Sequence, residues 1–187
     1  MTIIATIEGP KGSGKSTLAL DLAEKFNAYH VRFDENRFMT RKLLRDFAHD
    51  DHYYVLERGQ LSSMIYGWLR DAEYDARIYG ESLQTVWRPS SLRDFRLINE
   101  LSKINLVLTA DTQTLLNRIH SRDVEIGKGA TAQEYSELDS TRQMYEMWSE
   151  MFQSLGLSNF KTLDTTRVKY DDVLSAVTAY VDMSMKV

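Results

Sequence analysis

Short apolar runs alternate with longer amphipathic stretches along the chain. The run "TIIATIE" at residues 2–8 is rich in β-branched residues and almost continuously apolar, which is typical of a strand buried on both faces of a parallel sheet. Five short runs predict strands, at residues 2–8, 29–33, 53–57, 104–110 and 160–165. Apolar residues at helical spacing predict helices between them, at residues 16–26, 37–48, 60–78, 92–103, 114–122, 132–155 and 171–183.

This alternation indicates the fold class. Strands that alternate with helices form right-handed βαβ units, which build a parallel sheet covered on both faces. We therefore predict an α/β fold of three layers, with a central parallel sheet of about five strands flanked by helices. A chain of 187 residues is long enough for one well-buried domain and short for two, so we expect a single domain over residues 1–187.

Composition narrows the class of partner. The net charge of −4 gives no overall basic surface for nucleic acid, although a local basic groove is compatible with an acidic protein. The chain has no cysteine, which excludes disulfides and thiolate metal sites and fits a reducing cytosol. No stretch approaches the roughly 20 apolar residues of a membrane span, and the N-terminus lacks the cationic start of a signal peptide. We expect a cytoplasmic protein with no membrane partner.

Polar residues close three of the predicted strands. They are the pairs Glu8 and Gly9, Asp34 and Glu35, and Glu57 and Arg58. In an open parallel sheet, ligands bind beyond the carboxyl ends of the strands. We expect these three strand ends to meet at one cleft.

The first of these strand ends leads into "GPKGSGKST" at residues 9–17, which matches G-x-x-x-x-G-K-[ST] in full between a predicted strand and a predicted helix. Glycines let successive N–H groups face an anion, and the helix adds the positive end of its dipole. In such a loop Lys15 reaches the β and γ phosphates, and the Ser16 hydroxyl ligates Mg²⁺. Motif and context together disfavour a glycine-rich turn with a chance lysine. The residues expected to hold ATP are Gly9, Pro10, Lys11, Gly12, Ser13, Gly14, Lys15, Ser16 and Thr17.

The loop alone does not separate a kinase from a switch or a motor. A GTPase would need a guanine-reading N-K-x-D, which the chain lacks, and a large ATPase would need a longer chain. We therefore favour a kinase of a small molecule, with ATP and Mg²⁺ as cofactors and Glu57 as the acidic residue that holds or orders the metal. A nucleotide-binding switch without catalysis is the alternative from another class, and intact Lys15, Ser16 and Glu57 disfavour it.

The acceptor side depends on "LERGQLSSMIYG" at residues 56–67. Arg58 could bind an anionic acceptor as a two-pronged donor, or bridge the acceptor and the transferring phosphate; a surface Glu-Arg pair at a strand end is the plain alternative. The chain resembles the thymidylate kinase and deoxynucleoside kinase group of P-loop kinases, in "IEGPKGSGKST" and in this stretch. The positions that match are Glu57, Arg58, Ser62, Ser63 and Tyr66. That family usually has tyrosine or serine where this chain has Gly59, and Gln or Asn where it has Gly67.

The resemblance covers nearly the whole chain and implies further roles. "INLVLTADTQTLLNRIHSRD" resembles the strand, turn and helix leading to the family's lid, which here spans about residues 118–131. Arg118 and Arg122 match basic positions that close over the phosphates, and Lys128 could join them. A solvated pair on a helix is the alternative for the two arginines. "LDTT" at 163–166 resembles the loop beside the adenine. The resemblance also implies a homodimer.

The chemical nature of the acceptor stays open at this point. A hydroxyl acceptor would need a base, for which Asp34 and then Glu35 are the candidates, since a carboxylate faces the sugar 5′-hydroxyl in the deoxynucleoside kinases. A monophosphate acceptor would need cations such as Arg37 and Arg58 instead. Asp34 could also simply cap a helix. The residues expected to contact the acceptor are Asp34, Arg37, Arg58, Ser62, Tyr66 and Gln84.

We therefore predict an ATP-dependent phosphotransferase that acts on a deoxynucleoside monophosphate, with Lys15, Arg58, Asp34, Arg122 and Arg118 as its catalytic residues. Two alternatives keep the same chemistry. One is a deoxynucleoside kinase. The other phosphorylates a hydroxyl on DNA, such as a 5-hydroxymethyluracil base or a 5′ end, and a small phage-type kinase serving modified-DNA synthesis would resemble this chain. The acidic net charge disfavours that nucleic-acid partner.

Overall fold

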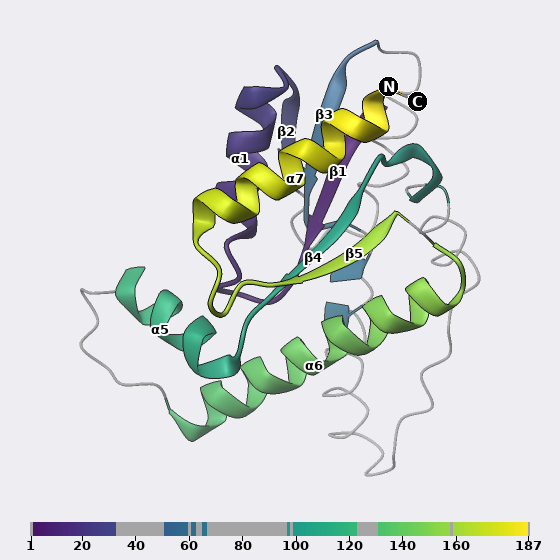
Figure 1. Ribbon diagram of the computed structural model, residues 1–187. Helices are drawn as coiled ribbons and strands as arrows, with labels where there is room; N and C mark the ends of the chain where they lie inside the picture. Colours follow the sequence, from purple (N-terminus) through teal and green to yellow (C-terminus); the bar gives the residue numbers. More distant parts are fainter. Residues whose placement is uncertain are drawn as a thin grey trace.

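The fold is seen in a computed structural model of the chain, drawn in Figure 1. The structure describes residues 2–32, 51–59, 61–62, 65–66, 97, 99–122, 131–157 and 159–186, without the side chains of Arg122 and Ala132. The elements in chain order are β1 (Thr2–Glu8), α1 (Lys15–Lys25), β2 (Tyr29–Arg32), β3 (Tyr53–Glu57), β4 (Asn105–Thr109), α5 (Thr112–Arg122), α6 (Ala132–Ser154), β5 (Phe160–Asp164) and α7 (Tyr170–Met185).

The strands form one parallel sheet of five strands in the order β2-β3-β1-β4-β5. β1 lies at its centre, where it pairs with β3 on one side and β4 on the other. The order of the strands in space differs from their order in the chain, as expected when crossovers cover both faces of a parallel sheet. The predicted α/β class with a central parallel sheet flanked by helices is confirmed.

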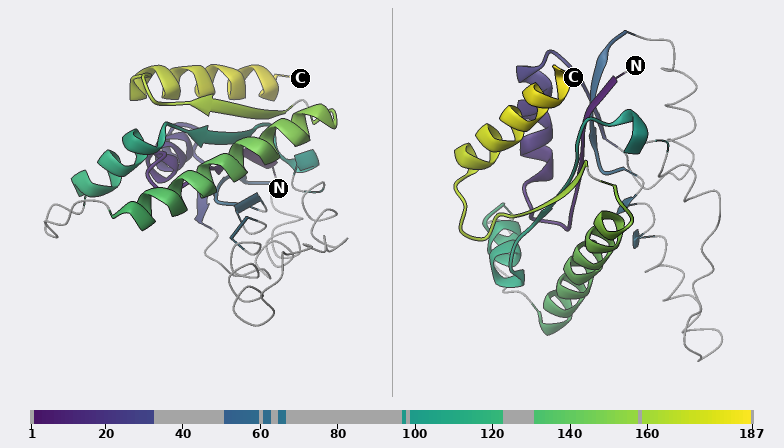
Figure 2. Two further views of the ribbon diagram at one scale, coloured as in Figure 1. Left: turned by 90° about the horizontal axis from the view of Figure 1, so that it is seen from below. Right: turned by 45° about the vertical axis from the view of Figure 1, so that its right-hand side comes forward.

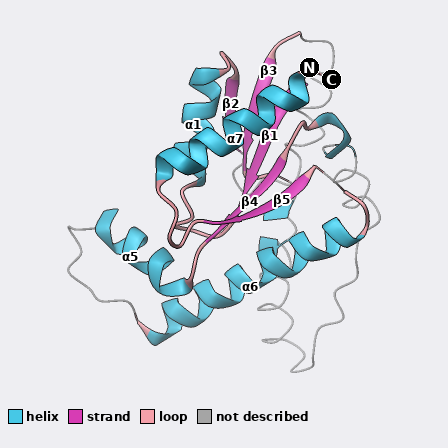
Figure 3. Cartoon of the chain, viewed as in Figure 1, coloured by secondary structure: helices cyan, strands magenta, loops and turns pink. Residues whose placement is uncertain are grey.

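Helices cover both faces of the sheet, giving three layers (Figures 2 and 3). On one face α1 and α7 pack against the sheet through a core of small and branched aliphatic side chains, including Leu18, Leu22 and Val177. On the other face α6 packs with Tyr145 and Phe152. The strands β1, β3 and β4 are buried under both helix layers and are mostly apolar. This is why the sequence predicts them as nearly continuous apolar runs.

The ends of α6 follow known signals. Thr131 and Glu134 form a reciprocal capping box, in which the Thr131 hydroxyl accepts from the Glu134 N–H at 3.1 Å and Glu134 accepts from the Thr131 N–H at 2.7 Å. At the other end Gly156 has φ 83°, and Leu157 N–H donates to Phe152 O at 3.2 Å. This left-handed turn follows the last residue of α6, Ser154, one residue before the predicted end at 155.

Several predictions fall outside the described residues. They are the helix at 37–48, most of the helices at 60–78 and 92–103, the lid residues 123–130, and the site residues Asp34, Glu35, Arg37, Ser63, Gly67, Gln84 and Lys128. Within the described parts of the chain, none of the helices is long and apolar enough to cross a membrane.

Candidate functional site

The loop between β1 and α1 has the backbone of an anion cradle. Gly9 has φ 138°, and a Cβ added there would lie 2.1 Å from the Leu108 carbonyl oxygen of β4. Gly14 has φ 89° and stands immediately before the first residue of α1. Any other residue would be strained at both positions, so the glycines of the motif are needed for the loop to curl against the sheet and lead into the helix. The loop thus sits at the N-terminus of α1, where anions bind.

Lys15 is the first residue of α1 and only 6% of its surface is exposed. Its Nζ donates a hydrogen bond to the Pro10 carbonyl oxygen at 2.6 Å, so the side chain folds back over its own loop. Burial first, and then the positive charge of Arg58, lower the pKa of Lys15 to about 7, against smaller opposing effects of Glu57 and Glu8. A bound polyphosphate would supply the negative charge that this buried amine lacks.

Ser16 links α1 to the end of β3. Its hydroxyl donates to Glu57 Oε1 at 2.5 Å, and the other carboxylate oxygen of Glu57 lies 3.0 Å from Nε2 of His30. Glu57 is 1% exposed, and Arg32 Nε approaches it at 3.9 Å. The predicted metal residues Ser16 and Glu57 are therefore brought together, with His30 and Arg32 of β2 behind the carboxylate.

These residues fit a nucleotide with Mg²⁺. The Ser13 hydroxyl is buried and has no hydrogen-bond partner within the described residues, so the loop holds a polar group that the protein itself does not satisfy. A hydroxyl and a carboxylate are hard oxygen ligands of the kind that Mg²⁺ binds directly or through water. Among the described residues, no group of three or more His, Asp or Glu side chains could hold a metal by itself.

Arg58 occupies an unusual backbone conformation. Its φ is 58°, in the left-handed region, and its N–H donates to the Ile7 carbonyl oxygen at 2.9 Å. The Nε atom is buried and has no hydrogen-bond partner within the described residues. A non-glycine residue in this region costs about 1–2 kcal/mol. A strained arginine at the carboxyl end of the sheet, with a buried donor that no described residue accepts from, is suited to bind an anion, and its binding role stays a prediction.

The side chain of Ser62 is buried inside the protein. It is 3% exposed, its hydroxyl donates to Glu8, and its Oγ lies 2.7 Å from the Tyr145 hydroxyl oxygen. We expected Ser62 to contact the acceptor, but this hydroxyl is engaged inside the protein. Tyr66, in contrast, is partly exposed on the same helical stretch.

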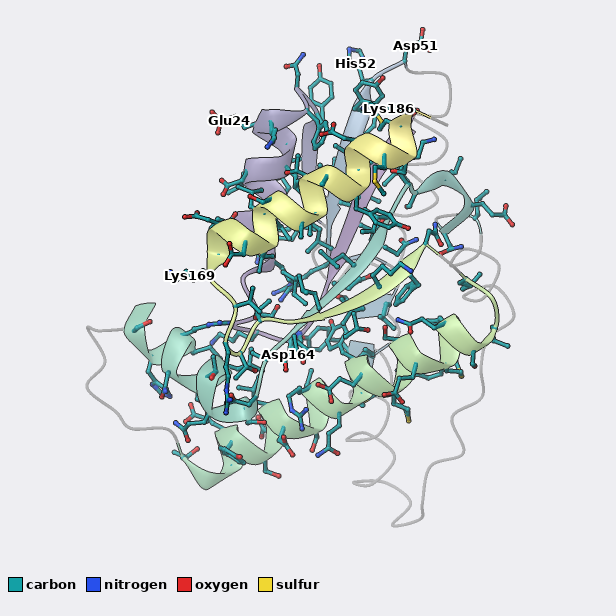
Figure 4. All side chains as sticks on the ribbon, viewed as in Figure 1. Glu24, Asp51, His52, Asp164, Lys169 and Lys186 are labelled. Carbon is teal, nitrogen blue, oxygen red and sulfur yellow. The ribbon has the colours of Figure 1, made fainter. Side chains whose placement is uncertain are left out.

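Arg118 also differs from its expected role. Its guanidinium donates to Thr165 Oγ1 at 2.9 Å and to the Thr165 carbonyl oxygen at 2.7 Å. Thr165 directly follows Asp164, the last residue of β5, which is labelled in Figure 4. In this arrangement Arg118 holds the loop after β5 rather than reaching the phosphate loop. Arg122 ends α5, and its side chain is not among those described.

Two functional candidates were missed from the sequence. His30 was not singled out from the sequence, but it contacts Glu57 across the pairing of β2 with β3. Glu8 was grouped with the other strand-end carboxylates, but it is buried against the turn that follows Arg58. Only knowledge of which strands are neighbours would have identified either contact.

Comparison with known proteins agrees with this geometry. No known family model matches the chain. A curated cytidylate kinase from Haloarcula marismortui is 29% identical over 183 residues, covering 92% of this chain and 86% of the relative. Since this similarity extends over most of both chains, it is not confined to one motif.

Solved structures share the fold. The YorR protein of Bacillus subtilis, in complex with phosphorylated GDP, superposes with a TM-score of 0.66 and 17% identity, covering 100% of this chain and 99% of its own. Thymidylate kinase from Candida albicans gives 0.62 and 16%, covering 98% and 92%. Deoxyadenosine kinase from M. mycoides with bound dCTP gives 0.59 and 15%, covering 98% and 100%. The chain has the fold of the P-loop nucleotide and nucleoside kinases.

Proposed function

We propose that the chain is an ATP-dependent kinase that transfers the γ-phosphoryl group of ATP to a deoxynucleoside monophosphate. The observation that carries this proposal is the phosphate loop, in which Lys15 is buried at the start of α1 and Ser16 is hydrogen-bonded to Glu57. This arrangement suits a polyphosphate with a metal ion better than any other ligand. The similarity to a cytidylate kinase over 92% of the chain supports a nucleotide acceptor.

We assign a role in this reaction to four of the described site residues. An acceptor oxygen attacks the γ-phosphorus in line, and the bond to the oxygen that bridges to the β-phosphorus breaks, which releases ADP. Lys15 and the loop N–H groups bind the β and γ phosphates, and Ser16 with Glu57 would hold magnesium. When bound, Mg²⁺ neutralises charge on the phosphate oxygens. Arg58 would bind the acceptor phosphate, or bridge it to the group in transfer.

A monophosphate acceptor fits the described residues better than a hydroxyl. A phosphate oxygen is already an anion, so it needs cations rather than a base. The carboxylates Glu8 and Glu57 are both buried and already accept hydrogen bonds. A deoxynucleoside acceptor would instead depend on Asp34 or Glu35 as its base. This second candidate stays open because the structural neighbours include both a nucleoside kinase and a nucleotide kinase. Arg37, Tyr66 and Gln84 remain proposed contacts to the acceptor, Arg122 remains a proposed lid residue, and a homodimer remains a prediction.

The test is ADP release from ATP and Mg²⁺ by the purified protein, with a panel of acceptors. The panel holds the deoxynucleosides, their monophosphates, cytidine monophosphate, and DNA with and without 5-hydroxymethyluracil. We expect turnover on a monophosphate. Lys15→Ala should abolish it, whereas Lys25→Ala, an exposed lysine at the far end of the same helix, should leave it unchanged. Turnover only on a nucleoside or DNA hydroxyl would reject the monophosphate proposal, and no turnover on the whole panel with ATP still bound would favour the switch.

A further inference from the structure

Glu8 is a buried carboxylate that the phosphate loop does not use. It ends β1, 2% of its surface is exposed, and its Oε1 accepts from the N–H groups of Gly59 at 2.9 Å and Leu61 at 3.0 Å. Its Oε2 accepts from the Ser62 N–H at 3.1 Å and from the Ser62 hydroxyl. All four donors belong to Gly59, Leu61 and Ser62, which we together call the Arg58 turn because they follow that residue closely in the chain. The carboxylate thus holds these residues by three backbone N–H groups and one hydroxyl.

A carboxylate is costly in this place. Burial raises the pKa of Glu8, and the hydrogen bonds from Ser62, Gly59 and Leu61 lower it in part. An amide of the same shape could accept on one oxygen only, and its NH₂ group would face N–H donors. Four converging donors therefore require an acceptor on both sides of the group, which only a carboxylate provides.

The Arg58 turn helps to fix the backbone conformation of Arg58. The Arg58 N–H is held by the Ile7 carbonyl oxygen, and the next N–H, that of Gly59, is held by the Glu8 side chain. Two consecutive residues of β1 therefore hold the backbone on either side of the left-handed Arg58, whose φ is 58°. Such backbone strain persists only where the surroundings impose it, and here these two hydrogen bonds hold the backbone.

Gly59 and Glu8 fit one another. A Cβ added at Gly59 would lie 2.9 Å from Glu8 Oε1 and 2.9 Å from Thr6 Cγ2. A larger residue would push the turn away from β1 and lengthen the N–H bond to the carboxylate. The glycine that stands where the resembling kinases usually have serine or tyrosine thus allows a close contact between the Arg58 turn and β1.

We propose that Glu8 is a positioning residue, whose carboxylate holds the Arg58 turn in the one backbone conformation that presents the Arg58 guanidinium to the acceptor phosphate. This role rests on the proposed kinase function for its catalytic effect. The hydrogen-bond network around Glu8 continues to Tyr145 of α6. The Ser62 hydroxyl donates to Glu8 and must then accept from the Tyr145 hydroxyl. Glu8 touches neither nucleotide in this account; it acts through Arg58.

The kinetic test is a double-mutant cycle on the full chain with the acceptor that gives turnover. We expect Glu8→Gln to lower kcat about tenfold or more while the KM for ATP stays within about twofold. The combined variant, Glu8→Gln with Arg58→Ala, should be no slower than Arg58→Ala alone, because both changes remove the same interaction. Multiplicative losses in the combined variant would show that Glu8 acts independently of Arg58 and would overturn the proposal.

Two further variants separate positioning from stability. Thr6→Val is a control on the same strand, since it removes a buried hydrogen bond, Thr6 Oγ1 to Ser102 Oγ at 3.0 Å, and keeps a methyl group in place of the Cγ2 that lies beside Gly59. It should leave kcat unchanged even where it lowers the melting temperature. Gly59→Ala places a methyl group between the Arg58 turn and β1, and should therefore shift the turn and lower kcat although Glu8 is intact. A kcat that tracks melting temperature across all the variants would reduce Glu8 to a structural role.

A readout without turnover keeps this proposal distinct from the kinase function. In NMR spectra of the protein, Glu8→Gln should speed hydrogen exchange at the amides of Gly59, Leu61 and Ser62 and shift the Nε–H signal of Arg58, whereas Thr6→Val should do neither. If no acceptor in the panel is phosphorylated, the kinase proposal fails while these signals still test the link between Glu8 and Arg58. If the signals do not respond to Glu8→Gln, the positioning role fails whatever the enzyme phosphorylates.

Discussion

Replacing Lys15 should stabilise the protein in the absence of nucleotide while removing its function. The ammonium group is buried, and its folded-state pKa of about 7 lies well below the ordinary 10.5 because of burial and then because of Arg58. At about 1.4 kcal/mol for each pKa unit, this difference corresponds to on the order of 5 kcal/mol against the charged form. Lys15→Met keeps the length of the side chain without the charge. It forfeits the hydrogen bond to the Pro10 carbonyl oxygen, worth about 2 kcal/mol for a charged donor. We therefore expect a net gain of about 3 kcal/mol at pH 7.

The pH dependence gives this prediction its sign. Between pH 7 and 10.5 the unfolded chain binds more protons at Lys15 than the folded protein does, so the wild-type free energy of unfolding rises with pH relative to the variant. The advantage of Lys15→Met should be fully present near pH 6 and should shrink by about 3 kcal/mol by pH 9. Urea unfolding of both proteins at pH 6, 7.5 and 9 measures the gap, and other titrating groups cancel in the difference.

Nucleotide should reverse the order of stability. Bound ATP would place negative charge beside Lys15 and raise its pKa, so wild type should gain stability with ATP and Mg²⁺ while Lys15→Met should not. A matched control is Lys25→Met, which removes an exposed charge at the other end of α1 and should change neither the stability nor its pH dependence. A Lys15→Met protein that is less stable than wild type at pH 7 without nucleotide, or a gap that does not depend on pH, would refute the reasoning.

Three smaller predictions concern the helix start, the loop after β5 and the glycines. Thr131→Ala should cost about 1 kcal/mol in thermal unfolding by removing the capping box of α6, and Thr131→Ser should restore it. Arg118→Ala should raise the KM for ATP about tenfold with little change in kcat, since it removes the bonds that hold the loop after β5. An equal loss in kcat would instead indicate that Arg118 contacts the phosphates during the reaction. Gly12→Ala and Gly156→Ala both impose a side chain at positive φ, but only at Gly12 would the Cβ meet a carbonyl, that of Leu115 at 2.7 Å. Gly12→Ala should therefore be the more destabilising by roughly 1–3 kcal/mol in urea unfolding.

The central strands β1, β3 and β4 were predictable because they are buried nearly throughout, whereas the edge strands β2 and β5 are largely exposed. β1 and β3 coincide with the predicted strands at residues 2–8 and 53–57, and the other strands end within about one residue of expectation. α5 begins at Thr112, two residues before the predicted start, because Asp111 caps it: the Thr114 N–H donates to Asp111 Oδ1 at 2.7 Å. Apolar spacing reports the buried face of a helix and gives no information on a cap that lies before it.

The phosphate loop was predictable and its surroundings were not, for a physical reason. A loop that binds phosphate through its backbone needs glycines at fixed spacing, so the sequence alone carries the signal. The contacts of His30, Arg118 and Ser62 join segments 27 to 83 residues apart. Such contacts depend on which strands are neighbours and how they are registered, and no local pattern records them.

Glu8 and Glu57 look alike in the sequence, since each ends a buried strand, yet they contact different parts of the chain. Register separates them: Glu57 pairs with Ile7 and faces Ser16 at the start of α1, whereas Glu8 pairs with Val107 and holds Gly59. Glu57 itself and Gly59, which Glu8 holds, flank Arg58 in the chain. In the proposed reaction, the spacing between donor and acceptor would be set by the pairing of β1 with β3, two largely buried strands at the centre of the sheet. In-line transfer tolerates little error in that spacing, and a central strand pair supplies the rigidity that a surface loop would lack.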